Sequence, residues 1–247
     1  MTSWQELGDG IFRRRWESLD LNIGLVLSEL GALVVDSRAT HGQADELIEE
    51  IRSVTSLPVT HLVNTHHHWD HTFGNARFTG ADLFGHLRCR ETLLERGEAM
   101  RQRLLDADWL PPEAKPHFAA VEIVPPEHVF EDRLEINMGD RVVRLTYLGR
   151  GHTDNDIVID VDDVTFAGDL VEEGAPPQFG DAYPRDWLAT LDSLADHVRG
   201  TVVPGHGDVV DHEFIVDQRD RIARAIDGEP MFPDQIMDQL RGRLRPG

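Results

Sequence analysis

The feature that most constrains this chain is a cluster of potential metal ligands placed directly after an apolar strand. The strand signal is Val59–Val63, and the segment after it reads Asn64-Thr65-His66-His67-His68-Trp69-Asp70-His71. In extended backbone His66 and His68 project the same way, while Asp70 and His71 lie on the turn that follows. Without a metal, neutral imidazoles this close together need partners, and charged ones repel each other. The segment therefore predicts a metal site at a strand end, since histidine is the commonest metal ligand.

Three later segments each place one more ligand-type side chain after a strand-like run. His152 stands in Gly149-Arg150-Gly151-His152-Thr153, Asp169 in Phe166-Ala167-Gly168-Asp169-Leu170, and His206 in Val203-Pro204-Gly205-His206-Gly207. The neighbouring glycines permit close approach of the backbone. Any one of these segments alone would be an ordinary turn. Together with the first cluster they predict that several strand ends meet at one metal site.

These residues, in this order, resemble the metallo-β-lactamase superfamily. His66, His68, Asp70 and His71 match its His-x-His-x-Asp-His signature, and the three later segments match its next three motifs. The resemblance runs from about Leu21 to about His212. It implies an α/β fold, a four-layer αβ/βα sandwich of two mixed β-sheets with outer helices, which we expect to occupy residues 1–247 as a single domain.

The resemblance divides the ligands into two sets that share one carboxylate. It implies that one metal is held by His66, His68 and His152, the other by Asp70, His71 and His206, and that Asp169 bridges them. Asp36, which ends an earlier strand, resembles the aspartate that orients a ligand histidine through its outer nitrogen. We expect two zinc ions, although iron or manganese would also suit such a donor set.

The chemistry expected of such a centre is hydrolysis. Two cations about 3.5–4 Å apart can share a hydroxide, because each lowers the pKa of bound water toward ~7. We therefore expect a hydrolase of a small ester, thioester, lactone or amide, with Asp70 and Asp169 as the carboxylates that hold the reacting centre. No side-chain nucleophile is then required, and Cys89 is expected to be a small buried apolar side chain.

Other members of the superfamily remain as alternatives. Asp169 stands where one class of true β-lactamases has a cysteine and another a serine, so the centre looks more like that of glyoxalase II and the lactonases. Glu172 stands three residues further on, where one β-lactamase class has a lysine that grips the drug's carboxylate; its negative charge would repel that group. A β-lactamase proper, a mononuclear iron dioxygenase acting on persulfides and a non-catalytic metal-binding member are the alternatives.

The pattern of apolar residues predicts how strands and helices alternate around these motifs. Strands are expected at Leu21–Leu27, Ala32–Val35, Val59–Val63, Ala120–Val124, Val142–Leu148, Asp156–Val161, Thr165–Ala167 and Thr201–Val203, and helices at Gln43–Val54, Glu91–Leu105, Trp187–Val198 and Glu213–Ile226. The segment from about 87 to 126 is expected to be a helical insertion over the site. With Trp69, Trp109, Phe179 and Tyr183 it would wall a small, partly apolar substrate pocket.

Composition limits the partners of the chain. The net charge is −21, with 45 acidic side chains against 24 basic ones, so most of the surface should repel nucleic acid and anionic membrane. No apolar run approaches the ~20 residues of a membrane helix, and no signal peptide is visible. A single cysteine allows no internal disulfide. We expect a cytoplasmic enzyme acting on a small molecule.

Overall fold

The computed structural model describes residues 4–245, whose strands form two mixed β-sheets. The strands are β1 (Gln5–Gly8), β2 (Ile11–Arg15), β3 (Asn22–Ser28), β4 (Gly31–Val35), β5 (Val59–Val63), β6 (Asp82–His86), β7 (His128–Phe130), β8 (Arg133–Asn137), β9 (Val142–Tyr147), β10 (Ile157–Val161), β11 (Val164–Glu172) and β12 (Thr201–His206). One sheet runs β1-β2-β3-β4-β5-β6-β7 and is parallel from β4 onward. The other runs β12-β11-β10-β9-β8, and only its β11–β12 pair is parallel.

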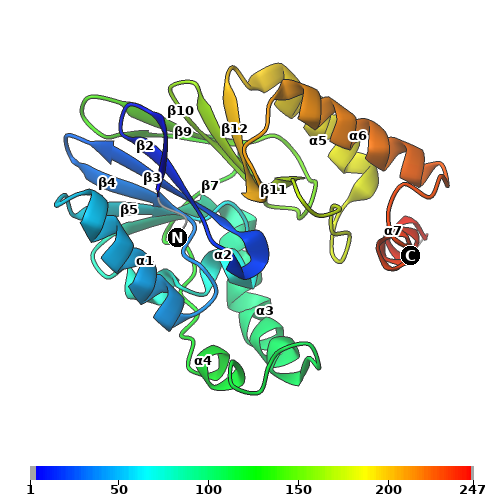
Figure 1. Ribbon diagram of the computed structural model, residues 1–247, viewed down its shortest axis with the longest axis horizontal. Coiled ribbons are helices and arrows are strands. Elements are labelled where there is room, and N and C mark those ends of the chain that lie inside the picture. The colour runs from blue at the N-terminus through cyan, green and yellow to red at the C-terminus, as the bar shows by residue number, and fades with distance from the viewer. Residues whose placement is uncertain (1–3, 246–247) are drawn as a thin grey trace.

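Helices cover the outer faces of both sheets, which confirms the predicted fold class (Figure 1). The helices are α1 (His41–Val54), α2 (Trp69–Thr72), α3 (Leu87–Asp106), α4 (Lys115–Ala119), α5 (Pro184–His197), α6 (His212–Ile226) and α7 (Asp234–Leu244), with 3₁₀ turns η1 (Ser18–Asp20) and η2 (Asn75–Arg77). Figure 1 shows α1 outside one sheet and α5 and α6 outside the other. Within residues 4–245, no helix combines the length and apolar character that a bilayer crossing needs.

The strand β4 shows how the layers are held together. All its residues are buried, because helices or strands cover both faces of the sheet. Leu33 and Val35 face the second sheet, in a cluster that includes Phe166 of β11. Ala32 and Val34 face the opposite way, in a cluster that includes helix α1. This alternation follows from the two-residue period of a strand, and it places the main core between the sheets.

Two further clusters position the elements around the site. The outer face of the second sheet packs against α5, α6 and α7 through a cluster centred on Trp187. Helices α3 and α4 pack on each other through Leu93, Met100 and Phe118, and Cys89 is buried in the same cluster. The segment from about 87 to 126, which was expected to be a helical insertion, contains these two helices. That the whole chain, residues 1–247, forms a single domain stays a prediction. Residues 1–3 and 246–247 of that domain lie outside the described residues.

The structure corrects two details of the predicted elements. Ala120–Val124 is irregular rather than a strand, because Val121 packs into the helical cluster and Ile123 contacts Gly97 of α3. Packing thus outweighs the β propensity of these residues. Asp169 does not follow the end of a strand: it lies inside β11, at a register irregularity next to Gly168, whose φ is +53°.

The contact between the sheets gives the first prediction. A Cβ at Gly24 of β3 would lie 2.5 Å from the ring of Phe166. We expect Gly24→Ala to lower the free energy of unfolding by about 1–3 kcal/mol, as overpacking of a core does. Gly42→Ala in α1 is the control, because a Cβ there meets nothing within 4 Å; it should leave stability unchanged or raise it by up to ~1 kcal/mol. Urea unfolding of both variants measures the difference, and equal stabilities would contradict this packing.

Candidate metal centre

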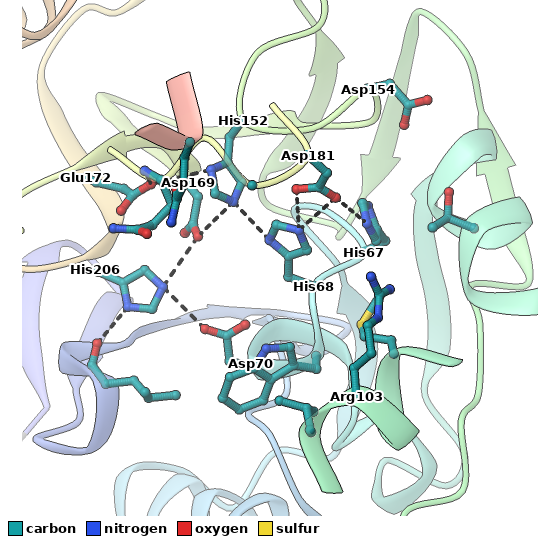
Figure 2. A pocket seen from close by; sticks show the side chains of 18 of the residues that line it. His67, His68, Asp70, Arg103, His152, Asp154, Asp169, Glu172, Asp181 and His206 are labelled. Carbon is teal, nitrogen blue, oxygen red and sulfur yellow. Dashed lines mark hydrogen bonds and ion pairs between the residues drawn. The ribbon is translucent and has the colours of Figure 1, made fainter. Parts of the chain in front are cut away.

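The structure brings all seven predicted ligands together, and Figure 2 labels His68, Asp70, His152, Asp169 and His206 among them. His66 and His68 lie on the loop after β5, and His152 lies on the loop between β9 and β10. Asp169 comes from within β11, and His206 is the last residue of β12. Asp70 and His71 are not on an open turn but in the one-turn helix α2. Residues 140 positions apart in the chain therefore share one buried space.

Asp169 lies between two groups of histidines. Its Oδ2 is 3.7 Å from His66 Nε2, 3.4 Å from His152 Nε2 and 3.4 Å from His206 Nε2. Its Oδ1 is 3.3 Å from His71 Nε2. One carboxylate therefore faces ligand-type nitrogens on both sides, which is the placement a bridging ligand needs.

The donor atoms fall into the two predicted groups. His66, His68, His152 and Asp169 have ligand atoms within 4.8 Å of one another, and so do Asp70, His71 and His206. Asp70 Oδ2 lies 3.4 Å from His206 Nε2 and 3.7 Å from His71 Nε2. The carboxylate of Asp169 contacts both groups, and the rings of His66 and His71 also lie 4.3 Å apart between centroids.

Unsatisfied buried atoms test whether these residues fit a metal. His66 Nε2, His71 Nε2 and Asp169 Oδ1 are buried and have no hydrogen-bond partner among the described residues. Buried polar atoms in proteins are nearly always paired, so several orphans in one space call for a ligand. Nitrogen and carboxylate donors in this number suit a transition-metal ion such as zinc. The residues present fit the predicted metal centre.

His71 and His206 are each held by a contact to the ring nitrogen that faces away from Asp169. Asp36 Oδ2 lies 2.8 Å from His71 Nδ1 and also accepts from Thr65 Oγ1, the orienting contact that was expected of Asp36. His206 Nδ1 donates to the carbonyl of Leu19 at 2.7 Å. Such contacts fix the ring and its tautomer, so that one nitrogen of each ring faces the shared space.

Two further carboxylates lie beside predicted ligands, and the sequence did not predict these contacts. Asp181 lies 3.1 Å from His68 Nε2, which leaves His68 Nδ1 facing His152 Nε2 at 2.9 Å. Glu172 Oε1 lies 3.4 Å from His152 Nδ1, but that nitrogen has no hydrogen-bond partner among the described residues. Glu172 is buried, and burial together with Asp169 raises its pKa to about 8, which weakens the negative charge that the sequence predicted there.

The ligand histidines fall into two electrostatic groups. Burial lowers the pKa of His152 to about 4 and that of His66 well below its usual value. Burial would also lower the pKa of His71 and His206, but Asp169 raises it well above the usual value. Burial alone would raise the pKa of Asp169, but His206 and His71 hold it well below its usual range. Because neutral imidazole and ionised carboxylate are the forms that bind a metal, a cation would have to displace protons from His71 and His206.

His67 belongs to neither ligand set, although it reaches the same cavity. Its Nδ1 accepts from Asn155 Nδ2 at 2.9 Å, and its Nε2 lies 3.3 Å from Asp181 Oδ2. With His68 and Asp181 it forms a third close group of ligand-type atoms, all within 4.8 Å of one another.

A large cavity of about 1210 Å³ opens over these residues. Trp69, Trp109 and Tyr183 line it, as expected. Phe179 does not: its side chain is fully buried and packs on Trp187 and Phe232, so its prediction as a pocket residue is wrong. The cavity is also larger than the small pocket expected, because α3 and α7 contribute walls at some distance from the ligands.

The comparison with known proteins identifies the family. A family model described as the metallo-beta-lactamase superfamily matches residues 19–206. That stretch is well over half of the sequence, and it contains all the residues described above as possible metal ligands. The chain therefore belongs to the metallo-β-lactamase superfamily, which places it among the hydrolases of that superfamily.

Individual relatives agree with this assignment. The type 2 metallo-β-lactamase of Bacillus cereus is 26% identical over 201 residues, which cover 78% of this chain and 70% of that protein. The one from Bacteroides fragilis is 24% identical over 207 residues, covering 81% and 74%. Among solved structures, TMB-1 has a TM-score of 0.70 at 20% identity and covers 91% of this chain and 98% of its own. The metallo-β-lactamase from Pontibacter korlensis has a TM-score of 0.70 at 16% identity, with 90% and 99% covered. At such identities the structures show the shared fold.

The contrast between Asp169 and Cys89 gives the second prediction. Asp169→Ala removes the carboxylate between the two groups and should reduce both metal content and hydrolysis strongly. Cys89→Ala should leave both within about two-fold, because the thiol is fully buried and burial raises its pKa well above its usual value. Elemental analysis and a hydrolysis assay of both variants measure this. A Cys89→Ala variant as impaired as Asp169→Ala would contradict the assignment of roles.

Proposed function

We propose that this chain is a dinuclear metal-dependent hydrolase that cleaves a small-molecule ester, thioester, lactone or amide. One metal is held by His66, His68 and His152 and the other by Asp70, His71 and His206, with Asp169 bridging them. The observation that carries the proposal is the carboxylate of Asp169, whose oxygens lie 3.3–3.7 Å from nitrogens of both histidine groups. Zinc is the proposed metal, because the donors are mostly imidazole.

When bound, the metal pair supplies a hydroxide nucleophile at neutral pH and polarises the carbonyl that is attacked. The chain's own residues supply the geometry. Asp36 and Asp181 hold His71 and His68 in fixed orientations, and Asp70 and Asp169 provide the negative charge that retains two cations. No serine or cysteine nucleophile is required.

Two alternatives from the sequence receive less support. A mononuclear iron dioxygenase would leave one of the two donor groups without a role, whereas both are complete and close together. A non-catalytic member has no need of a large cavity over the ligands. The cytoplasmic location stays a prediction that rests on the single cysteine.

The remaining question is whether β-lactams are the substrate, as the names of the relatives state for those proteins. The lysine that grips the drug's carboxylate in one β-lactamase class is replaced by Glu172, which is buried beside His152. Arg150 does not replace it, because it pairs with Asp186 at 2.5 Å and lines a separate depression. We therefore propose that β-lactams are poor substrates, because the position beside the ligands that holds their carboxylate in that class carries Glu172, whereas Arg103 lies on another wall of the cavity.

A substrate panel before and after chelation tests both parts of the proposal. The panel contains a penicillin, a cephalosporin, a carbapenem, a lactone, a thioester and an aryl ester, with kcat/KM measured on one preparation. We expect at least one ester, thioester or lactone to be hydrolysed, and every β-lactam to stay below about 10⁵ M⁻¹ s⁻¹, the lower part of the range of evolved enzymes.

Chelation should abolish this hydrolysis and lower the melting temperature, because a ligand that binds only the folded state stabilises it. Activity that survives complete metal removal would contradict the metal-dependent mechanism. A β-lactam turned over faster than the limit above would contradict the proposed preference while leaving the metal centre intact.

A further inference from the structure

One wall of the cavity is lined by basic and apolar side chains and, among the described residues, by no acidic ones. It is formed by α3 from Arg96 onward and the turn after it, and the residues that line the cavity there are Arg96, Met100, Arg103, Leu104, Ala107 and Trp109. None of them is acidic, in a chain whose net charge is −21. The spacing of seven residues between Arg96 and Arg103 places both on one face of the helix. This wall therefore combines positive charge with apolar surface.

Arg103 and Arg96, both on this wall, have no partner among the described residues. Most arginines of this acidic chain are paired with a carboxylate or a backbone carbonyl: in the same cavity, Arg88 lies 3.8 Å from Asp154, and Arg243 donates to the carbonyl of Ala182 at 2.6 Å. Among the described residues, Arg103 has neither an ion pair nor a hydrogen bond. In Figure 2 its guanidinium reaches up the cavity toward the side on which His67 and His68 lie.

The negative side chains around the cavity do not cancel this charge. Asp181 is occupied by His67 and His68, and Asp20 pairs with Arg15 at 2.5 Å. Asp154 is close to Arg88, and Glu173 accepts from the backbone N–H of Asp208. Glu91 and Glu95 have no such partners, but they lie toward the start of α3. Arg103 is two or more helical turns away from them.

Apolar surface lines the same cavity as Arg103 and several of the ligands. Trp69 precedes Asp70 directly and packs against Phe118 of α4 with ring centroids 5.4 Å apart. Trp109 stands 6.2 Å from Trp69 between ring centroids, and 60% of its side chain is exposed. Exposed aromatic surface beside a cavity is typical of a site that binds a ligand. The substrate is the molecule that must enter there.

We propose that the substrate carries a carboxylate on an apolar arm, that Arg103 binds this carboxylate, and that Trp69 and Trp109 contact the arm. The inference rests on the proposed hydrolase function and adds the substrate class. A planar guanidinium binds a carboxylate through two parallel hydrogen bonds. Since the protein as a whole repels anions, an unpaired arginine inside the cavity selects an anionic substrate locally. Arg103 is thus a residue that determines specificity from the wall formed by α3.

A pair of substrates that differ only in charge tests this inference. The 4-nitrophenyl monoester of adipic acid is anionic, and the methyl ester of its free carboxyl group is neutral; both release the same nitrophenolate. We measure kcat and KM of both for the metal-loaded wild type, Arg103→Met and Arg103→Lys. Arg133→Met is the matched control, because Arg133 is exposed, has no ion pair or hydrogen bond among the described residues and lies away from the cavity.

Wild type and Arg133→Met should prefer the anionic ester. Arg103→Met should lower the kcat/KM ratio of anionic to neutral ester by about ten-fold, mainly through KM, since a charged hydrogen bond is lost. Arg103→Lys should retain part of the preference, because it keeps the charge but not the paired donors. A ratio that changes by less than about three-fold in Arg103→Met, no more than an exposed ion pair contributes, overturns the inference. Absence of metal-dependent hydrolysis of both esters would instead contradict the proposed function.

Discussion

The structure depends on one buried carboxylate that two groups of histidines share. Asp169 is only 5% exposed, and its two oxygens face His66, His71, His152 and His206. Burying such a charge is costly unless it is paired. The pairing here is with side chains that present unpartnered nitrogens, an arrangement that metal ions would satisfy. The ligand loops, their supporting residues and the cavity are all arranged around this carboxylate.

The fold brings these groups together through close contacts between strands. A Cβ on Gly205 of β12 would lie only 1.8 Å from Asp169 Oδ1, so a glycine is required where β12 passes the carboxylate. The irregularity of β11 at Gly168 turns Asp169 toward the site from within the strand. Bulges commonly redirect a side chain in this way next to functional sites. The parallel pair β11–β12 then presents Asp169 and His206 together.

The sequence predicted the fold through its resemblance to a known family, and that resemblance depends on local motifs that also contain the ligand set. Four ligands lie within six consecutive residues, and the others lie in short segments beside glycines. The supporting residues could not be found in this way. Asp181 reaches His68 from a loop 113 residues later in the chain, and no spacing rule connects them.

Packing explains the remaining differences between expectation and structure. Phe179 was expected at the pocket because it follows Asp169 closely, but Trp187 and Phe232 bury it. Ala120–Val124 contains residues that favour strands, but Val121 and Ile123 pack against the cluster of helix α3 instead. The sequence does not indicate which face of α3 lines the cavity, because that depends on how the helix packs beside the ligands. Side chains that act through tertiary contacts leave no local signal.

Anomalous diffraction from crystals grown with zinc would test the central claim most directly. The account predicts two zinc peaks about 3.5–4 Å apart, one beside His66, His68 and His152, the other beside Asp70, His71 and His206, with the carboxylate of Asp169 contacting both. A single peak, or a peak held by His67 and Asp181 with none at Asp169, would contradict it.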